Sequence, residues 1–161
     1  MGMKVGDWMS EEVVTVSPKE GVRVAEHLMK AKGIRHLPVV RDGTLVGIVS
    51  DRDIRRVLPS PATSLEIHEV HYLLEKLQVA EVMTREVITV TPETPIESAA
   101  DLLLLHKVGA LPVLDGTRLV GIISEADILQ AFRDAGREGE GEIGMCWHAD
   151  AMSGFRVSGS P

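Results

Sequence analysis

The sequence predicts a mixed α/β (α+β) fold, in which two copies of a β-α-β-β-α unit pack about a pseudo-twofold axis. The first observation behind this prediction is internal repetition, because residues 5–54 align without gaps on residues 79–128, 74 positions further on. The second is that each copy alternates short β-branched runs with stretches whose apolar residues recur at helical spacing. Two copies are too few for a solenoid, so we expect one pair of units that face one another.

The first half of each unit is expected to be a strand followed by a helix. Residues 13–16 are β-branched throughout, and Pro18 prevents strand pairing from continuing. The helix is expected over residues 22–32 and to end at Gly33, a typical C-cap. Its apolar residues recur at helical spacing, as Val22, Ala25, Leu28 and Met29.

The second half of each unit is expected to be a hairpin followed by another helix. Two short apolar runs, 37–40 and 45–49, flank Asp42-Gly43, a dipeptide typical of tight hairpin turns. The helix that follows begins after Ser50 and ends before Pro59. In the second copy, the two helices carry the apolar residues Ile96, Ala99, Leu102 and Leu103, and then Ile128, Leu129 and Phe132.

The chain is therefore divided into four parts. Residues 1–58 form the first repeat, residues 59–78 a linker that contains a helix over 64–77, and residues 79–133 the second repeat. After Phe132 the sequence becomes charged and then rich in Gly and Ser, so we expect residues 134–161 to be a flexible tail.

Composition excludes several classes of function. The net charge is −7 and no basic block exceeds the pair Arg55-Arg56, which argues against nucleic acid as a partner. Cys146 is the only cysteine, so an intrachain disulfide is impossible and a cysteine-based zinc site is not expected. No metal site is predicted. The N-terminus lacks the apolar core of a signal peptide, and no apolar run is long enough to span a membrane, so we expect a cytoplasmic protein with no membrane partner.

One segment with a Ser-x-x-Asp spacing occurs in both repeats. It is Gly47 to Ile54 in the first copy and Gly121 to Ile128 in the second, and each marks a strand that turns into a helix. Taken locally, the Ser and the Asp are explained equally well by helix capping. The alternative is a ligand site, in which the Asp accepts hydrogen bonds from sugar hydroxyls.

The order of the motifs resembles a pair of cystathionine-β-synthase-type (CBS) domains, also called a Bateman module. The matching features are Met9-Ser10 with Met83-Thr84, the strand-Pro segments 13–18 and 87–92, the stretches 33–39 and 107–113, and the two Gly-x-x-Ser-x-x-Asp segments. The resemblance covers residues 5–133, and it is closest to the CBS pairs of acetoin-utilisation-type proteins.

The resemblance implies that adenine nucleotides bind in clefts between the two repeats. Asp53 and Asp127 would bind ribose, and Ser50 and Ser124 would bind phosphate or ribose oxygens. An Asp of one repeat would work with the apolar pocket of the other. The adenine pocket would be apolar, formed by Val14, Ile34, Leu37, Pro38, Ile88, Val108, Leu111, Pro112 and Ile122.

The phosphate end is where we expect the two sites to differ. The first repeat carries Arg35 and His36, whereas the second has Gly109 and Ala110 at the same places. We expect the cleft served by Arg35 and His36 to bind more tightly. A triphosphate would need further cations, for which Arg52 and Lys107 are candidates.

The function expected from this resemblance is a non-catalytic regulatory or energy-sensing module that binds AMP, ADP or ATP and requires no cofactor. Motifs for nucleophilic hydrolysis, phosphate-binding loops and zinc catalysis are absent from the sequence, which argues against an enzyme. One alternative is a homodimeric assembly module with weak ligand sites, because the run 102–105 is entirely leucine. Another is a binder of S-adenosylmethionine or NAD. We expect a homodimer, and the effector protein it would regulate is unknown.

Overall fold

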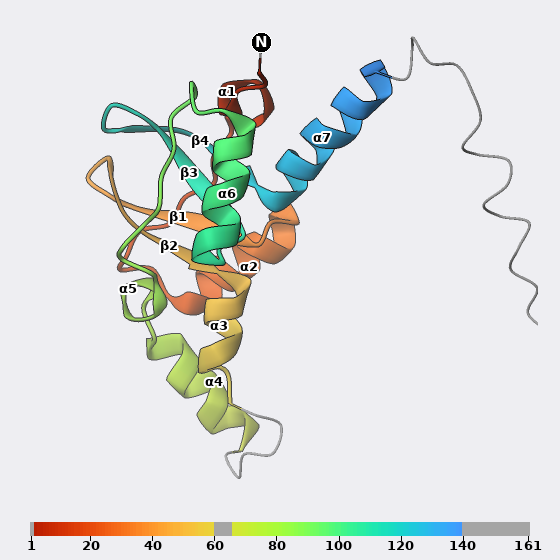
Figure 1. The fold of residues 1–161 in the computed structure, drawn as a ribbon. Coiled ribbons are helices and arrows are strands. Elements are labelled where there is room, and N and C mark those ends of the chain that lie inside the picture. Colours follow the sequence, from red (N-terminus) through yellow and green to blue (C-terminus); the bar gives the residue numbers. More distant parts are fainter. Residues whose placement is uncertain (1, 60–65, 140–161) are drawn as a thin grey trace, which may run out of the picture.

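A computed structural model describes residues 2–59 and 66–139 of the chain. The first half contains α1 (Val5–Trp8), α2 (Val22–Lys32), β1 (His36–Arg41), β2 (Thr44–Ser50) and α3 (Asp51–Val57). After α4 (Ile67–Lys76), the second half repeats the order with α5 (Val79–Val82), α6 (Ile96–His106), β3 (Ala110–Asp115), β4 (Arg118–Ser124) and α7 (Glu125–Gly139). The predicted twofold repetition of helices and hairpins is confirmed (Figure 1).

Each repeat contains one antiparallel two-stranded sheet, β1-β2 in the first and β3-β4 in the second. The hairpin turn at Asp42-Gly43 is confirmed, since both residues have positive φ, 49° and 77°, as a tight hairpin of this type requires. Both hairpins carry a bulge at equivalent places, between Val39 and Val40 and between Val113 and Leu114.

The strand expected over 13–16 is shorter than predicted. Only Val16 joins the sheet, through a parallel bridge to Val39, and Val90 makes the same bridge to Val113 in the second repeat. The run of β-branched residues is therefore extended backbone that touches the sheet at one point. Pro18 and Pro92, which cannot donate a backbone hydrogen bond, follow the paired residues, so they limit the pairing after Val16 and Val90 and do not explain why residues 13–15 stay unpaired.

The first helix of each sequence repeat belongs to the hydrophobic core of the other repeat. Val5 of α1 is fully buried in the core cluster of the second half, and Val79 of α5 is fully buried in that of the first half. Backbone bridges fix both exchanges, from Ser10 to Ile122 and from Thr84 to Ile48. The two short helices were not predicted, and through them the repeats hold one another in place.

The last helix runs further than the sequence analysis expected. Helix α7 continues to Gly139, so residues 134–139 are helical and do not belong to a flexible tail. These residues include Ala, Arg and Glu, which are good helix formers, so Gly136 is tolerated within the helix. The remainder of the expected tail, and residues 60–65 of the linker, lie outside the described residues. The linker helix is confirmed over Ile67–Lys76.

Candidate functional site

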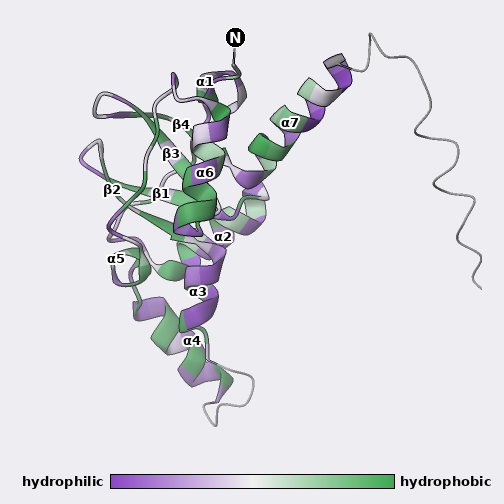
Figure 2. Cartoon of the chain, in the orientation of Figure 1, coloured by the Kyte–Doolittle hydropathy of each residue, from purple (hydrophilic) through white to green (hydrophobic). Residues whose placement is uncertain are grey.

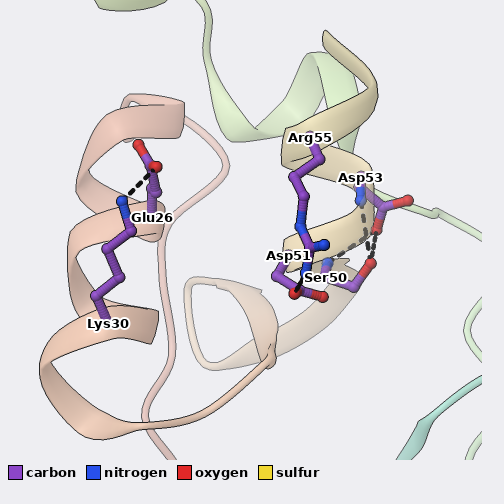
Figure 3. A network of polar contacts seen from close by, with 6 residues as sticks. All are labelled: Glu26, Lys30, Ser50, Asp51, Asp53 and Arg55. Atoms are coloured by element: carbon purple, nitrogen blue, oxygen red, sulfur yellow. Dashed lines mark hydrogen bonds and ion pairs between the residues drawn. The ribbon is translucent and has the colours of Figure 1, made fainter. Parts of the chain in front are cut away.

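Ser50 and Asp53 form a capping box at the start of α3. The Ser50 hydroxyl accepts a hydrogen bond from the Asp53 backbone N–H at 3.2 Å. Asp53 Oδ2 in turn accepts from both the backbone N–H and the hydroxyl of Ser50, each at 2.8 Å. Figure 3 shows these contacts at the junction of β2 and α3. The capping interpretation of this segment is therefore correct, and it fixes the direction of the carboxylate.

Ser124 and Asp127 repeat this arrangement at the start of α7. Asp127 Oδ2 accepts from the Ser124 backbone N–H at 2.8 Å and from its hydroxyl at 2.7 Å. In both boxes the bonds between described residues use Oδ2, and none uses Oδ1. Each carboxylate is thus held by one oxygen, which leaves the other able to accept hydrogen bonds from a ligand.

One cleft, here called cleft A, joins the pocket of the first repeat to the capping box of the second. Its volume is about 530 Å³, within the range of small-molecule sites. Of the predicted site residues it collects Val14, Ile34, Arg35, His36, Pro38, Ile122, Ser124 and Asp127. The expectation that an Asp works with the apolar pocket of the other repeat agrees with this geometry.

The opposite cleft, here called cleft B, combines the second repeat's pocket with the first repeat's capping box. It encloses about 320 Å³ and collects Ile88 and Val108 with Ser50 and Asp53. Arg52 and Lys107, the candidate additional cations, also line it, together with Arg56.

The two clefts share a wall, which the sequence analysis did not foresee. Arg35, His36, Gly109, Ala110 and Glu125 line both of them. Arg35 and His36 therefore do not line one cleft alone, and the expectation that they make one site the tighter stays a prediction. The imidazole lies against Gly109 so closely that a Cβ there would be 2.8 Å from His36 Cε1.

His36 is half-buried in this wall, and its surroundings oppose a positive charge. Burial lowers the pKa of the His36 imidazole, and Arg35 adds to this effect. The carboxylates of Asp51, Glu125 and Asp53 raise the pKa of His36, but they do not outweigh burial. Because an imidazole normally titrates near pH 6.5, His36 is neutral at pH 7 and presents one N–H donor and one acceptor.

Three residues of the predicted adenine pocket line neither cleft. Leu37 and Leu111 are fully buried, each in the hydrophobic core of its own repeat, and Pro112 is also buried. Successive side chains of a strand point to opposite faces, so Pro38 faces cleft A while Leu37 faces the core. The prediction that neighbouring apolar residues form one surface is therefore wrong for Leu37 and Pro38, because of this alternation.

Several lining residues were missed. Ser10 and Glu12 line cleft A, and Thr84, Glu86 and Arg56 line cleft B. Ser10, Glu12, Thr84 and Glu86 lie in or next to the segments that the two repeats exchange. Their signal was the Met-Ser/Thr start of each repeat, since Ser10 and Thr84 pair with the strands that lead into the capping boxes.

A third groove, of about 360 Å³, lies between α2 and α3 and adjoins both clefts, because Arg35 lines all three. Its sides carry two ion pairs, Lys30 with Glu26 at 2.8 Å and Arg55 with Asp51 (Figure 3). Asp53 turns toward Ser50, away from these pairs. Four of the charged side chains of this groove are therefore engaged with local partners, and Arg35 is the remaining charged residue in its lining.

Comparison with known families identifies the repeats. The family profile described as "CBS domain" matches residues 5–60 and again residues 79–134. The chain belongs to the CBS domain family. It is a tandem CBS pair, as the order of its motifs indicated.

Curated relatives differ in how much of their length the CBS pair represents. Inosine-5'-monophosphate dehydrogenase of Thermoplasma acidophilum is 35% identical over 82% of this chain, but the chain spans only 24% of that enzyme. The CBS domain-containing protein YhcV of Bacillus subtilis is 34% identical over 77% of the chain and matches over 81% of its own length.

Solved structures agree with the fold over most of the chain. The AcuB protein of Vibrio cholerae has a TM-score of 0.71 at 31% identity, covering 88% of this chain and 98% of its own. CBSX2, solved in complex with AMP, has a TM-score of 0.69 at 33% identity and covers 84% of this chain and 100% of its own. The CBS pair of MJ0100, solved with 5'-methylthioadenosine and S-adenosyl-L-methionine, has a TM-score of 0.70 at 27% identity, with coverages of 84% and 99%.

Within the described residues, none of the helices combines the length and the apolar character needed to span a bilayer.

Proposed function

We propose that this chain is a non-catalytic regulatory module that binds adenine nucleotides in clefts A and B. One observation carries the proposal: each cleft joins an apolar pocket of one repeat to a carboxylate, held by a capping box, of the other. CBS pairs of similar structure bind AMP, S-adenosyl-L-methionine and 5'-methylthioadenosine, which share an adenosine group. The whole protein's regulatory target is a separate question, and we name no effector.

The adenosine group suits the chemistry of both clefts. In cleft A, adenine would lie against Val14 and Ile34 while its ribose hydroxyls donate to Asp127. In cleft B, adenine would lie against Ile88 and Val108 and its ribose would donate to Asp53. Two hydroxyls that donate to one ionised carboxylate form strong, charge-assisted hydrogen bonds, and these would orient the nucleoside.

The two serines act on the ligand through the carboxylates. Each hydroxyl already donates its only proton to Oδ2 of its own capping box, as for Ser50 at 2.8 Å and Ser124 at 2.7 Å. In this arrangement the serines hold Oδ2 and leave Oδ1 for the ligand. They can donate to a phosphate or ribose oxygen only by giving up that bond, but each Oγ can still accept from a ribose hydroxyl.

Isosteric substitution of the carboxylates tests the proposal. We expect Asp53→Asn and Asp127→Asn each to weaken AMP binding at one site by about 1–3 kcal/mol, because a charged acceptor is lost. Calorimetric titration with adenosine, AMP and ADP measures this, with thermal unfolding as the control for intact capping. Folded wild-type protein that binds none of these ligands, or two variants with unchanged affinities, would contradict the proposal. Hydrolysis of a nucleotide above background would contradict its non-catalytic part.

A second candidate function, homodimeric assembly, is favoured by an exposed apolar surface on α6 and α7. Leu104, Leu105, Leu129 and Phe132 are exposed by 77%, 75%, 69% and 44%. In Figure 2, α7 projects from the body and alternates hydrophobic (green) with hydrophilic (purple) segments. The equivalent residues of the first repeat include Lys30 and Arg55, which are engaged in ion pairs. This difference makes α6 and α7 the apolar face on which a second copy would pack.

The first repeat supplies the substitutions for a test of assembly. We expect Leu104→Lys with Leu129→Arg, which places the charges of the first repeat on the second, to convert a dimer into a monomer. Light scattering at micromolar concentration measures the mass. Ala31→Ser, on the charged face of α2, serves as a control that should leave the mass unchanged. A monomeric wild-type protein would contradict the assembly proposal, but it would leave the ligand-binding proposal untouched.

A further inference from the structure

The two clefts differ most in the charged side chains that line them. Cleft B is lined by four cations, Arg35, Arg52, Arg56 and Lys107, whereas cleft A has only Arg35. The shared residue Arg35 therefore cannot explain the difference. It comes from three positions that belong to cleft B alone.

The carboxylates do not cancel this difference. Cleft B contains Asp51, Asp53, Glu86 and Glu125, but Asp51 pairs with Arg55 and Asp53 occupies the proposed ribose position. Two carboxylates then face four cations. In cleft A, with Asp127 assigned to ribose, Glu12 and Glu125 face a single cation. Apart from the carboxylate assigned to ribose, the lining is thus basic in cleft B and acidic in cleft A.

The internal repeat shows where the difference arises. At an offset of 74 positions, Arg52 corresponds to Ala126, Arg56 to Gln130 and Lys107 to Gly33. Ala126 and Gly33 line cleft A, so the same places in the two clefts hold a cation on one side and a small neutral residue on the other.

We infer that the two clefts sort adenosyl ligands by charge, which rests on the proposed function: cleft B prefers nucleotides with two or three phosphates, and cleft A prefers adenosyl ligands with one phosphate or none. Arginine guanidinium groups bind phosphate oxygens through paired hydrogen bonds, and a lysine adds a point charge. Each added phosphate strengthens binding where cations are in excess and weakens it where carboxylates are. Arg52 and Arg56, both on α3, are the residues that set this specificity.

The alternative is that Arg52 and Arg56 are ordinary solvated side chains. Both are exposed, so long side chains at the mouth of the cleft could remain in water when a ligand binds. The two interpretations differ in how the loss of Arg52 and Arg56 affects affinity. If the arginines bind phosphate, the loss of affinity grows with the number of phosphates on the ligand; if they stay in water, affinity does not change.

The test uses the equivalent residues of the other repeat. Arg52→Ala with Arg56→Gln gives cleft B the neutral residues of its counterpart, in a background of Asp127→Asn that isolates cleft B. In titrations with adenosine, AMP and ADP, we expect ADP affinity to fall about tenfold or more, because two charged contacts are lost, and adenosine affinity to change less than about twofold. In the opposite direction, Ala126→Arg with Asp53→Asn should raise ADP affinity at cleft A several-fold.

The outcomes separate this inference from the proposed function. Unchanged ADP affinity in the arginine variant, or equal losses for ADP and adenosine, would overturn charge sorting while the clefts remain nucleotide sites. Failure of Ala126→Arg to strengthen ADP binding would also count against it. Absence of adenosine, AMP and ADP binding in the wild-type protein would overturn the proposed function, and the sorting inference with it.

Discussion

At the scale of single residues, the contact between His36 and Gly109 joins the two repeats. A Cβ at position 109 would lie 2.8–2.9 Å from the imidazole ring, so a side chain there would force His36 to move from its present position. The first repeat has Arg35 at the place of Gly109, and the fit therefore depends on the two repeats being different here. His36 lines both clefts, which makes its protonation relevant to each of them.

Protonation of His36 should make stability depend on pH. Burial lowers the pKa of His36, and the positive charge of Arg35 lowers it further. The carboxylates of Asp51, Glu125 and Asp53 raise this pKa, but burial has the larger effect. Below about pH 6.5 the unfolded chain binds a proton that the folded chain does not. The free energy of unfolding should therefore fall as the pH drops from 7.5 to 5.5, and it should fall less in His36→Asn. Urea denaturation at the two pH values measures both, and equal losses would show that His36 contributes nothing.

Residue-level predictions succeeded where the backbone pattern determines the side chain. The capping residues Ser50 and Asp53 followed from their spacing at a strand-helix junction, and the structure has them there. Leu37 and Pro38 were grouped because both are apolar, although the alternation along β1 sends them to opposite sides. The shared wall at His36 could not be predicted, because it depends on how closely the repeats approach at Gly109.

At the scale of elements, the exchange of α1 and α5 ties the halves together. Each exchanged segment ends on a methionine that packs on a strand glycine: a Cβ would lie 2.5 Å from Met9 Sδ at Gly121 and 2.6 Å from Met83 Sδ at Gly47. The sequence contains both glycines and both methionines at repeated positions, but four-residue helices have too little periodicity to be recognised. Which core they join depends on tertiary packing alone.

The exchange predicts that the N-terminal segment stabilises the second repeat. Val5→Ala removes two methyl groups from a fully buried site in that core, so we expect a loss of about 1–3 kcal/mol in the free energy of unfolding. Val79→Ala should have a similar effect through the first repeat, whereas Val24→Ala, at an exposed site on α2, should change stability by less than about 0.5 kcal/mol. Urea unfolding measures all three, and equal effects of Val5→Ala and Val24→Ala would show that α1 is only loosely attached.

At the scale of the whole molecule, the repeat determines the fold, and the differences between its two copies are the basis of the proposed difference between the clefts. The order of the elements, the hairpin turns and the helices α2 and α6 were predictable because local sequence patterns repeat with them. The extension of α7 beyond residue 133 was not predictable from the sequence, because a charged segment can continue a helix without an apolar face. The unequal charges of the clefts, with Arg52 in cleft B at the position that Ala126 has in cleft A, depend on which residues of the two repeats line each cleft. Only the three-dimensional structure gives that information.

Complementary pairs of substitutions can test the differences between the two repeats. Arg52 and Ala126 are equivalent positions, and substituting the residue of one repeat into the other changes the charge of a cleft. Lys30 and Leu104 are also equivalent, and substituting one for the other makes a helix face charged or apolar. In each pair one repeat serves as the natural control for the other. Both experiments therefore ask what the differences between the repeats do, in a fold that the repeats share.

The most direct test of the central claim is a crystal structure of the chain with AMP. The account predicts adenine against the apolar pocket of one repeat and ribose hydroxyls within hydrogen-bond distance of the Asp of the other. That means Val14 and Ile34 with Asp127 in cleft A, or Ile88 and Val108 with Asp53 in cleft B. Both clefts empty at saturating AMP, or AMP held only in the groove between α2 and α3, would contradict it.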